Sequence, residues 1–143
     1  VAQSPNSIEI FCSASGIENA VSFSLRFGAD KWEFASSSIG DGFHNATVWV
    51  NANQALTGRI GFALALPPNR TLSAGHRLIA VLTFRQRLGN IAPLFSQLAV
   101  EFADQPIARE VVSAEAQSLR ANFASDFLAL VTQRLAAAQT RRR

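Results

Sequence analysis

Sulfur-containing residues and long hydrophobic runs are scarce in this sequence. The 143 residues include one cysteine and no methionine, so no disulfide can form within the chain. Cys12 stands in line with Ile8 and Ile10 on one face of a predicted strand, and we expect a buried thiol rather than a reactive one. No run approaches the ~18 uninterrupted apolar residues of a membrane-spanning helix. We therefore expect a soluble chain with no membrane span.

Groups that could carry catalysis are also few. The two histidines, His44 and His76, stand far apart in loop-like sequence, and the ten acidic residues are scattered singly. No spacing resembles a metal site, a calcium loop or a nucleophile with its base, and no glycine-rich turn joins a strand to a helix to hold phosphate. The sequence therefore predicts a protein that is not an enzyme and that needs no metal or cofactor.

The positive charge is concentrated at one end. Four of the 13 basic residues lie in residues 134–143, which contain no acidic residue, and the rest of the chain has nine basic residues against ten acidic ones. We expect one domain over residues 1–133 and a solvated basic tail over residues 134–143, with no nucleic-acid partner. Possible tail contacts to phosphate, anionic lipid or an acidic partner are assigned to Arg141, Arg142 and Arg143.

Short alternating segments fill the first two thirds of the chain. They are separated by loop-like stretches rich in Ser, Gly, Asn and Asp, such as those at 27–30 and 36–42. This pattern is typical of an all-β sandwich or barrel. Its large-residue faces predict a core of Phe23, Leu25, Ile60, Phe62, Leu64, Leu82 and Phe84. The predicted strands are Ser7–Cys12, Ala20–Phe27, Ala46–Val50, Gly58–Leu66, Arg77–Phe84 and Pro93–Phe102.

The strand Gly58–Leu66 has one face of large residues and one of small residues. Ile60, Phe62 and Leu64 alternate with Gly61, Ala63 and Ala65, so a smooth surface is expected on the side away from the core. The polar stretch "PPNRTLSAGH" follows it before the next strand begins. Residues 113–140 are ambiguous, because their composition favours helix while "DFLALVT" alternates like a strand.

Two kinds of residue indicate contact with sugars. The sequons "NAT" and "NRT" make Asn45 and Asn69 candidate N-glycosylation sites, although a chain of this composition contains about one sequon by chance. Trp32 and Trp49 are candidates for stacking on a polysaccharide, provided that both face outward. The alternative for each tryptophan is a place in the sandwich core.

Three segments taken in order carry a family resemblance. "ENAVSFSLRF", "GRIGFALALPPNRTLSAGHRLIAVLTF" and "EFADQPIAREVVSAEAQSL" are similar to the cohesin-like domains of exported bacterial proteins, over residues 16–119. The resemblance implies a jelly-roll β-sandwich of about nine strands, in which the "PPNRTLSAG" stretch crosses between strands. The family usually has a complete strand before the counterpart of Ser7–Cys12, and we expect this sequence to lack it, because seven residues precede Ile8.

The resemblance also implies a function. Cohesins are scaffold modules that bind dockerins through an exposed sheet face, so we expect a non-catalytic, extracellular or cell-surface module that binds a protein through its smooth face. No dockerin-contacting residue can be assigned from it. One alternative is a fibre or pilus subunit that exchanges terminal segments with another copy of itself. A second alternative is a carbohydrate-binding module. A chain that begins at Val1 and lacks methionine agrees with removal of a secretory signal or excision from a larger protein.

Overall fold

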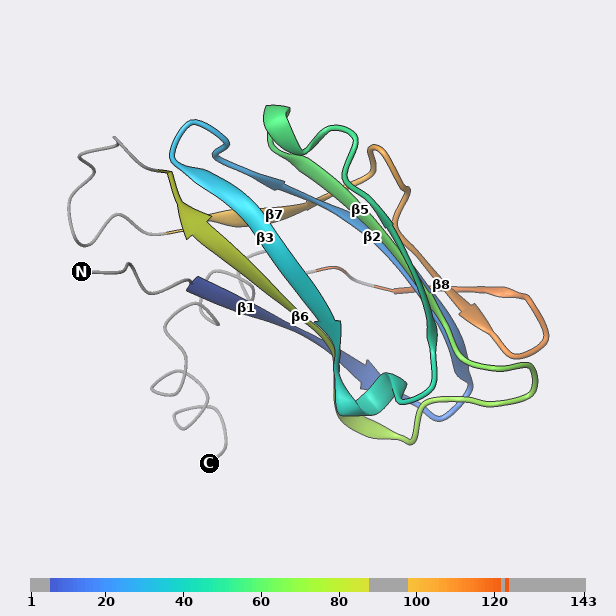
Figure 1. Cartoon of the computed structure of the whole chain (residues 1–143). Coiled ribbons are helices and arrows are strands. Elements are labelled where there is room, and N and C mark those ends of the chain that lie inside the picture. Colours follow the sequence, from blue (N-terminus) through green and yellow to red (C-terminus); the bar gives the residue numbers. More distant parts are fainter. Residues whose placement is uncertain (1–5, 88–97, 122, 124–143) are drawn as a thin grey trace.

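The computed structural model describes residues 6–87, 98–121 and 123, which form a sandwich of two antiparallel β-sheets (Figure 1). Two short 3₁₀ helices, η1 (Asp41–Phe43) and η2 (Ala55–Thr57), flank strand β4. The strands are β1 (Asn6–Ala14), β2 (Glu18–Phe27), β3 (Trp32–Ile39), β4 (Thr47–Asn51), β5 (Arg59–Ala65), β6 (Gly75–Gln86), β7 (Val100–Ala103), β8 (Glu110–Ser113) and β9 (Ser118–Leu119).

The two sheets differ in size. The smaller sheet has the strand order β1-β6-β3, and the larger sheet has the order β4-β5-β2-β8-β9, with β7 also paired to β2. Strand β6 lies in the centre of the smaller sheet, and its segment "RLIAVLTF" is apolar on both faces because residues on both faces are buried or half-buried. The described residues thus confirm the predicted all-β sandwich of about nine strands.

The core forms where the large-residue faces of the two sheets meet. All seven predicted core residues, including Phe23, Phe62 and Phe84, are at most 2% exposed. Phe34 on β3 reaches across to the larger sheet, with its ring centroid 6.1 Å from that of Phe62 on β5. Its ring also lies 5.7 Å from that of Phe84 on the neighbouring strand β6 of its own sheet. The rings meet edge to face, the geometry that aromatic pairs favour. The contact between Phe34 and Phe62 joins the two layers.

Strand β3 is not among the strands that the sequence predicts. Its residues 36–39 have the composition of a loop, because three consecutive serines are poor strand formers. The structure pairs them with β6, so that Ser37 lies opposite Leu82 and Ile39 opposite Ala80. Tertiary pairing with an apolar central strand therefore outweighs the local preference of the serines.

Two smaller expectations about the smaller sheet also need correction. His76 lies within β6 rather than in a loop, and its ring stacks on Phe11 with the centroids 4.3 Å apart. Cys12 is only half-buried, and it lies opposite Arg77 near the end of the β1–β6 pairing. Burial still raises the pKa of the Cys12 thiol, and the negative charge of Glu18 adds to the effect.

Some expectations fall outside the described residues. Of the predicted strand Pro93–Phe102, the described part begins at residue 98 and contributes β7. Of the ambiguous stretch 113–140, the described part forms the end of β8 and strand β9. The tail 134–143, with Arg141, Arg142 and Arg143, lies outside.

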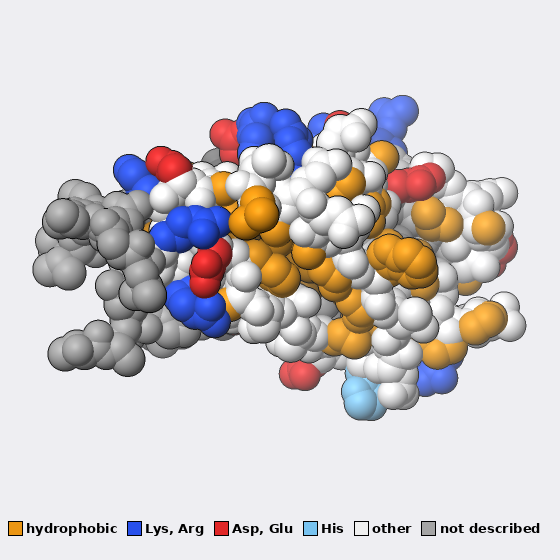
Figure 2. Space-filling model, turned by 45° about the horizontal axis from the view of Figure 1, so that its top comes forward, with side chains coloured by type: hydrophobic (Ala, Val, Ile, Leu, Met, Phe, Trp, Pro, Cys, Tyr) orange, Lys and Arg blue, Asp and Glu red, His pale blue; other side chains and the backbone are white. Residues whose placement is uncertain are grey.

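The described surface separates charged from apolar side chains. Ion pairs join Glu33 to Arg85 and Arg87, and Arg26 to Glu101. Figure 2 shows hydrophobic side chains gathered across the middle of one view, with charged side chains towards its periphery.

None of the helices in the described residues is long and apolar enough to cross a membrane.

Candidate interaction face

The larger sheet turns a surface of small side chains away from the core. Residues directly opposite one another in antiparallel strands point to the same face, and the register aligns Ser22 with Ala63 and Ala63 with Trp49. We call the surface of nine residues from the three strands β2, β5 and β4 the outer face. It consists of Ala20, Ser22, Ser24, Gly61, Ala63, Ala65, Thr47, Trp49 and Asn51.

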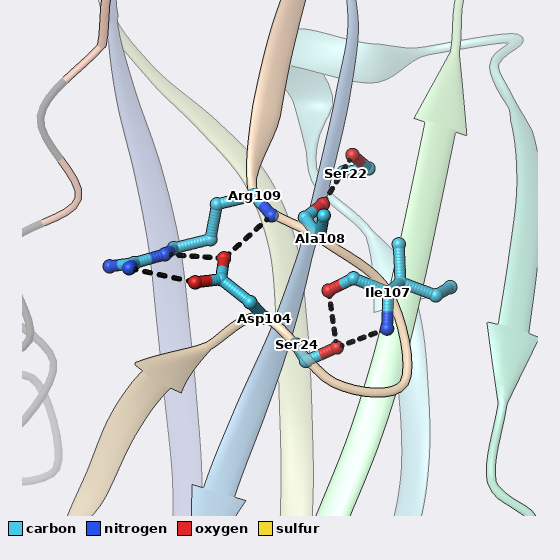
Figure 3. A network of polar contacts seen from close by, with 6 residues as sticks. All are labelled: Ser22, Ser24, Asp104, Ile107, Ala108 and Arg109. Atoms are coloured by element: carbon cyan, nitrogen blue, oxygen red, sulfur yellow. Dashed lines mark hydrogen bonds and ion pairs between the residues drawn. The ribbon is translucent and has the colours of Figure 1, made fainter.

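A loop lies across one part of the outer face. The Ser24 hydroxyl donates a hydrogen bond of 2.6 Å to the Ile107 carbonyl and accepts one of 2.7 Å from the Ile107 N–H. The Ser22 hydroxyl donates a hydrogen bond of 2.8 Å to the Ala108 carbonyl (Figure 3). Two serines of β2 therefore fasten the segment 104–109, which we call the strap, to the sheet.

The strap approaches the sheet closely at a glycine. A Cβ atom added to Gly61 would lie 2.6 Å from Cγ1 of Ile107 and under 3.0 Å from its Cδ1. Cβ contacts this short are essentially never seen, so any other residue at position 61 would have to displace the Ile107 side chain. Gly61 and Ser24, which lie opposite each other, are both buried as a result. The small residues at this end of the outer face thus serve packing.

The ends of the strap are joined by an ion pair. The Asp104 carboxylate accepts hydrogen bonds of 2.9 Å from Nε and 3.1 Å from an Nη atom of Arg109, and one of 3.1 Å from the Arg109 N–H (Figure 3). The side-chain hydrogen bonds of Arg109, followed by its backbone N–H, lower the pKa of Asp104. Both side chains are exposed, so the pair fixes the loop geometry more than it stabilises the fold.

The other end of the outer face is open. Trp49 lies on β4 and is 68% exposed, beside the half-buried Ala63. Trp32 is different, because it lies in the core at 5% exposure, on the other sheet. The condition that both tryptophans face outward as a sugar platform is therefore not met, because Trp32 belongs to the hydrophobic core. Trp49 is the tryptophan that remains at the surface.

The polar stretch after β5 has a structural explanation. The Asn19 side-chain amide donates hydrogen bonds to the carbonyls of Leu66, Pro67 and Arg70, at 3.3, 3.1 and 2.8 Å. Leu72 is buried, and its N–H donates a hydrogen bond of 2.8 Å to the Glu18 carbonyl. The "ENA" segment at the start of β2 therefore holds the crossing between the two sheets, and its polarity requires no active site.

Glu18 stabilises the tight turn between β1 and β2. Its buried carboxylate accepts hydrogen bonds from the N–H and hydroxyl of Ser15, at 2.8 and 2.9 Å, and from the N–H groups of Gly16 and Ile17, at 3.0 and 3.1 Å. Burial on its own raises the pKa of Glu18. The hydrogen bonds from this turn outweigh burial, so the pKa is lowered. This carboxylate is a structural group rather than a catalytic one.

The remaining candidate residues lie apart from the outer face. Asn45 and Asn69 are on exposed turns with positive φ angles of 71° and 67°, and their glycosylation stays a prediction. His44 is exposed after η1. Within the part of the chain that the structure describes, no group of three or more His, Cys, Asp and Glu side chains is placed to hold a metal ion.

The strap cannot be found by reasoning from residue spacing alone. Ser22 and Ser24 alternate with apolar residues, as polar residues do in any half-buried strand. This pattern does not predict that Ile107 is the hydrogen-bond partner of Ser24. The signal in the sequence is the segment "DQPIAR", which contributes to the family resemblance. Asp104 and Arg109 are the first and last residues of this segment. An acidic and a basic residue in these positions could form an ion pair that closes a loop.

Comparison with known proteins identifies the fold. No protein-family model matches the sequence, and no curated protein sequence matches it either. Solved structures of cohesin domains do match. A non-cellulosomal cohesin from the hyperthermophilic archaeon Archaeoglobus fulgidus has a TM-score of 0.63 at 13% sequence identity, covering 83% of this chain and 75% of that one.

Two bacterial cohesins are similar to the same extent. The third cohesin of ScaC, solved in complex with the ScaB dockerin from Acetivibrio cellulolyticus, has a TM-score of 0.63 at 17% identity over 83% of this chain and 82% of that one. A type II cohesin domain from the cellulosome of the same organism has a TM-score of 0.59 at 8% identity over 86% and 82%. With its jelly-roll sandwich and these matches, the chain has the fold of cohesin domains.

Proposed function

We propose that this chain is a non-catalytic module that binds a protein partner through the open part of its outer face, around Trp49. The observation that carries the proposal is the flat surface of small residues beside one exposed tryptophan. Aromatic side chains are enriched among the residues that dominate binding energy, and small neighbours let a partner approach closely. The cohesin fold supports the same class of function, since similar structures were solved as complexes with dockerins.

The charged groups of the described residues also favour binding over catalysis. The Glu18 carboxylate accepts hydrogen bonds within a turn, and the Asp104 carboxylate pairs with Arg109 in the strap. Glu33 and Glu101 form ion pairs with arginines on neighbouring strands. These carboxylates have structural partners and do not converge on a cavity. A protein partner of the dockerin type is therefore the first candidate, and an exported location, extracellular or at the cell surface, fits the cellulosomal origin of one similar structure.

The two alternatives have less support. A carbohydrate-binding module would have to rely on Trp49 alone, because Trp32 is in the core. A fibre held by exchanged terminal segments depends on residues 1–5 and 124–143, which lie outside the described part of the chain. The polysaccharide and self-exchange alternatives therefore rank below the protein-binding module.

A displayed library of natural dockerin modules tests the proposal. Dockerins selected on the intact chain should lose at least about tenfold in affinity when Ala63→Arg places a long cation in the middle of the outer face. Ser38→Lys on β3, which lies in the other sheet, is the matched control and should bind normally. The proposal is wrong if no dockerin is selected, or if the selected dockerins bind Ala63→Arg as well as they bind the intact chain.

A further inference from the structure

Strand β4 is an edge strand without the protection that edge strands normally carry. It pairs with β5 on one side, and no other described strand pairs with it. Its sequence, Thr-Val-Trp-Val-Asn, contains β-branched and aromatic residues and has no charge and no proline. Natural edge strands avoid this composition because free N–H and C=O groups on a flat, apolar edge recruit another strand.

The other described edges are protected. Strand β3 carries Glu33 and has a bulge between Phe34 and Ser36. Strand β1 carries Glu9, and its pairing with β6 is interrupted by a bulge. At the far side of the larger sheet, β9 has two residues, and the four-residue β7 carries Glu101. Bulges, charges and short length are the usual means of blocking edge pairing, and β4 has no bulge and no charge.

The side chains of β4 also remain incompletely covered. Val48 and Val50 point to the core side, opposite Leu64 and Phe62 of β5, yet they are 37% and 38% exposed. Trp49 between them is exposed on the outer face. Figure 2 shows hydrophobic side chains at the surface across the middle of the molecule, away from most of the charges. A strand added beside β4 would cover the two valines on the core side and Trp49 on the outer face.

We propose that β4 pairs with β4 of a second copy of this chain, antiparallel and centred on Trp49. The five residues are complementary to themselves in this register. Trp49 lies opposite Trp49 of the second copy, Val48 opposite Val50, and Thr47 opposite Asn51. The two valine pairs extend the core rows, the tryptophans make an aromatic cross-strand pair, and the uncharged edge brings no like charges together.

The pairing joins the two larger sheets into one continuous sheet. A two-fold axis between the two Trp49 residues closes the assembly at two copies, because each chain uses its β4 edge once. An interface of five-residue strands is at the low end of interface sizes, so we expect a dimer with a Kd on the order of 10–100 µM. This inference concerns the edge of β4, and it shares the Trp49 side chain with the partner-binding surface proposed above. Val48→Lys on the core side of β4 and Ala63→Arg on the outer face separate the two proposals.

Light scattering of the full chain over about 1 to 500 µM, a range that brackets this Kd, measures the association directly. The intact chain should change from monomer to dimer. Val48→Lys should raise the dimer Kd at least about tenfold, because an inward-pointing lysine on an edge blocks strand addition. Ser38→Lys on the protected edge β3 should leave the dimer unchanged, and so should Ala63→Arg. A chain that stays monomeric over this range overturns the proposal.

Cysteine cross-linking tests the register without relying on the folding of Val48→Lys. In a Cys12→Ser background, Trp49→Cys places two cysteines directly opposite each other, with Cα atoms about 4.5–5.5 Å apart, within disulfide range. Thr47→Cys on the same face is the control, because its two copies are offset by four residues, about 13 Å. Mild oxidation should link Trp49→Cys chains into dimers and leave Thr47→Cys chains monomeric. Equal cross-linking of both variants, or of neither, contradicts this pairing.

Discussion

The two faces of strand β2 differ in the interactions that they make, although they belong to the same ten-residue strand. On one face Val21, Phe23 and Leu25 are buried against the smaller sheet. On the other face Ser22 and Ser24 hold the strap by hydrogen bonds. The inner face depends on volume and the outer face on directed polar contacts. The strand thus shows that a buried position need not be apolar, provided that each polar atom has its partner.

Removing volume from the inner face should have the largest effect. Phe23→Ala is expected to lower the free energy of unfolding by about 3–5 kcal/mol, because Phe23 is fully buried and its ring contacts Phe62 and Phe102. Urea denaturation measures the change. Phe23→Leu should lose distinctly less, and a loss for Phe23→Ala no greater than that for Phe23→Leu would mean that the inner face is loosely packed.

Glu18, the first residue of β2, is buried although its side chain is a carboxylate. Glu18→Gln should lower the free energy of unfolding by about 1.5–3 kcal/mol at neutral pH, because the amide NH2 group cannot accept the hydrogen bonds that one of the two carboxylate oxygens accepts, and the charge is lost. The lowered pKa of Glu18 means that its contribution is present above the ordinary glutamate pKa and is lost as the pH falls through the folded value.

Denaturation at several pH values separates this residue from the other carboxylates. The stability difference between the intact chain and Glu18→Gln should shrink as the pH falls through that window. A difference that is independent of pH would show that the carboxylate charge does not stabilise the turn.

Removing a hydroxyl from the outer face should have an intermediate effect. Ser24→Ala leaves both the N–H and the carbonyl of Ile107 without their partner, at a cost of about 1–2 kcal/mol. Ser22→Ala removes one exposed hydrogen bond and should cost less. Amide hydrogen exchange of Ile107 should rise in Ser24→Ala and stay nearly unchanged in Ser22→Ala. Equal exchange in both variants would argue against the strap being held by Ser24.

The exposed end of the outer face should matter least for stability. Trp49→Ser is expected to change the free energy of unfolding by no more than about 0.5 kcal/mol, because the side chain is mostly in water. Thermal unfolding at low protein concentration measures this without a contribution from self-association. A large loss of stability would mean that Trp49 is a packing residue, and the outer face would then be a weaker candidate for binding.

The sequence predicts the inner face better than the outer one. Burial follows the period of two, so Phe23, Leu25 and Phe62 can be placed in the core from spacing alone. Strand β3 cannot, because serines pair there only through their contact with β6. The strap joins residues more than 80 positions apart, and side-chain hydrogen bonds between distant segments have no periodic signal. Spacing therefore predicts the small-residue face but not the segment that covers part of it.

The pairing of β1 with β6 has a consequence for how the chain folds. Ile8 lies opposite Leu82, and Asn6 opposite Phe84, so the first strand finds its partner only after most of the domain has been synthesised. A fold dominated by such distant pairings closes long loops before its contacts form, and it reaches the native state on the millisecond-to-second scale. During that interval the apolar residues of β1 and the unprotected edge of β4 are exposed together, and such exposure is what makes partly folded chains prone to aggregate.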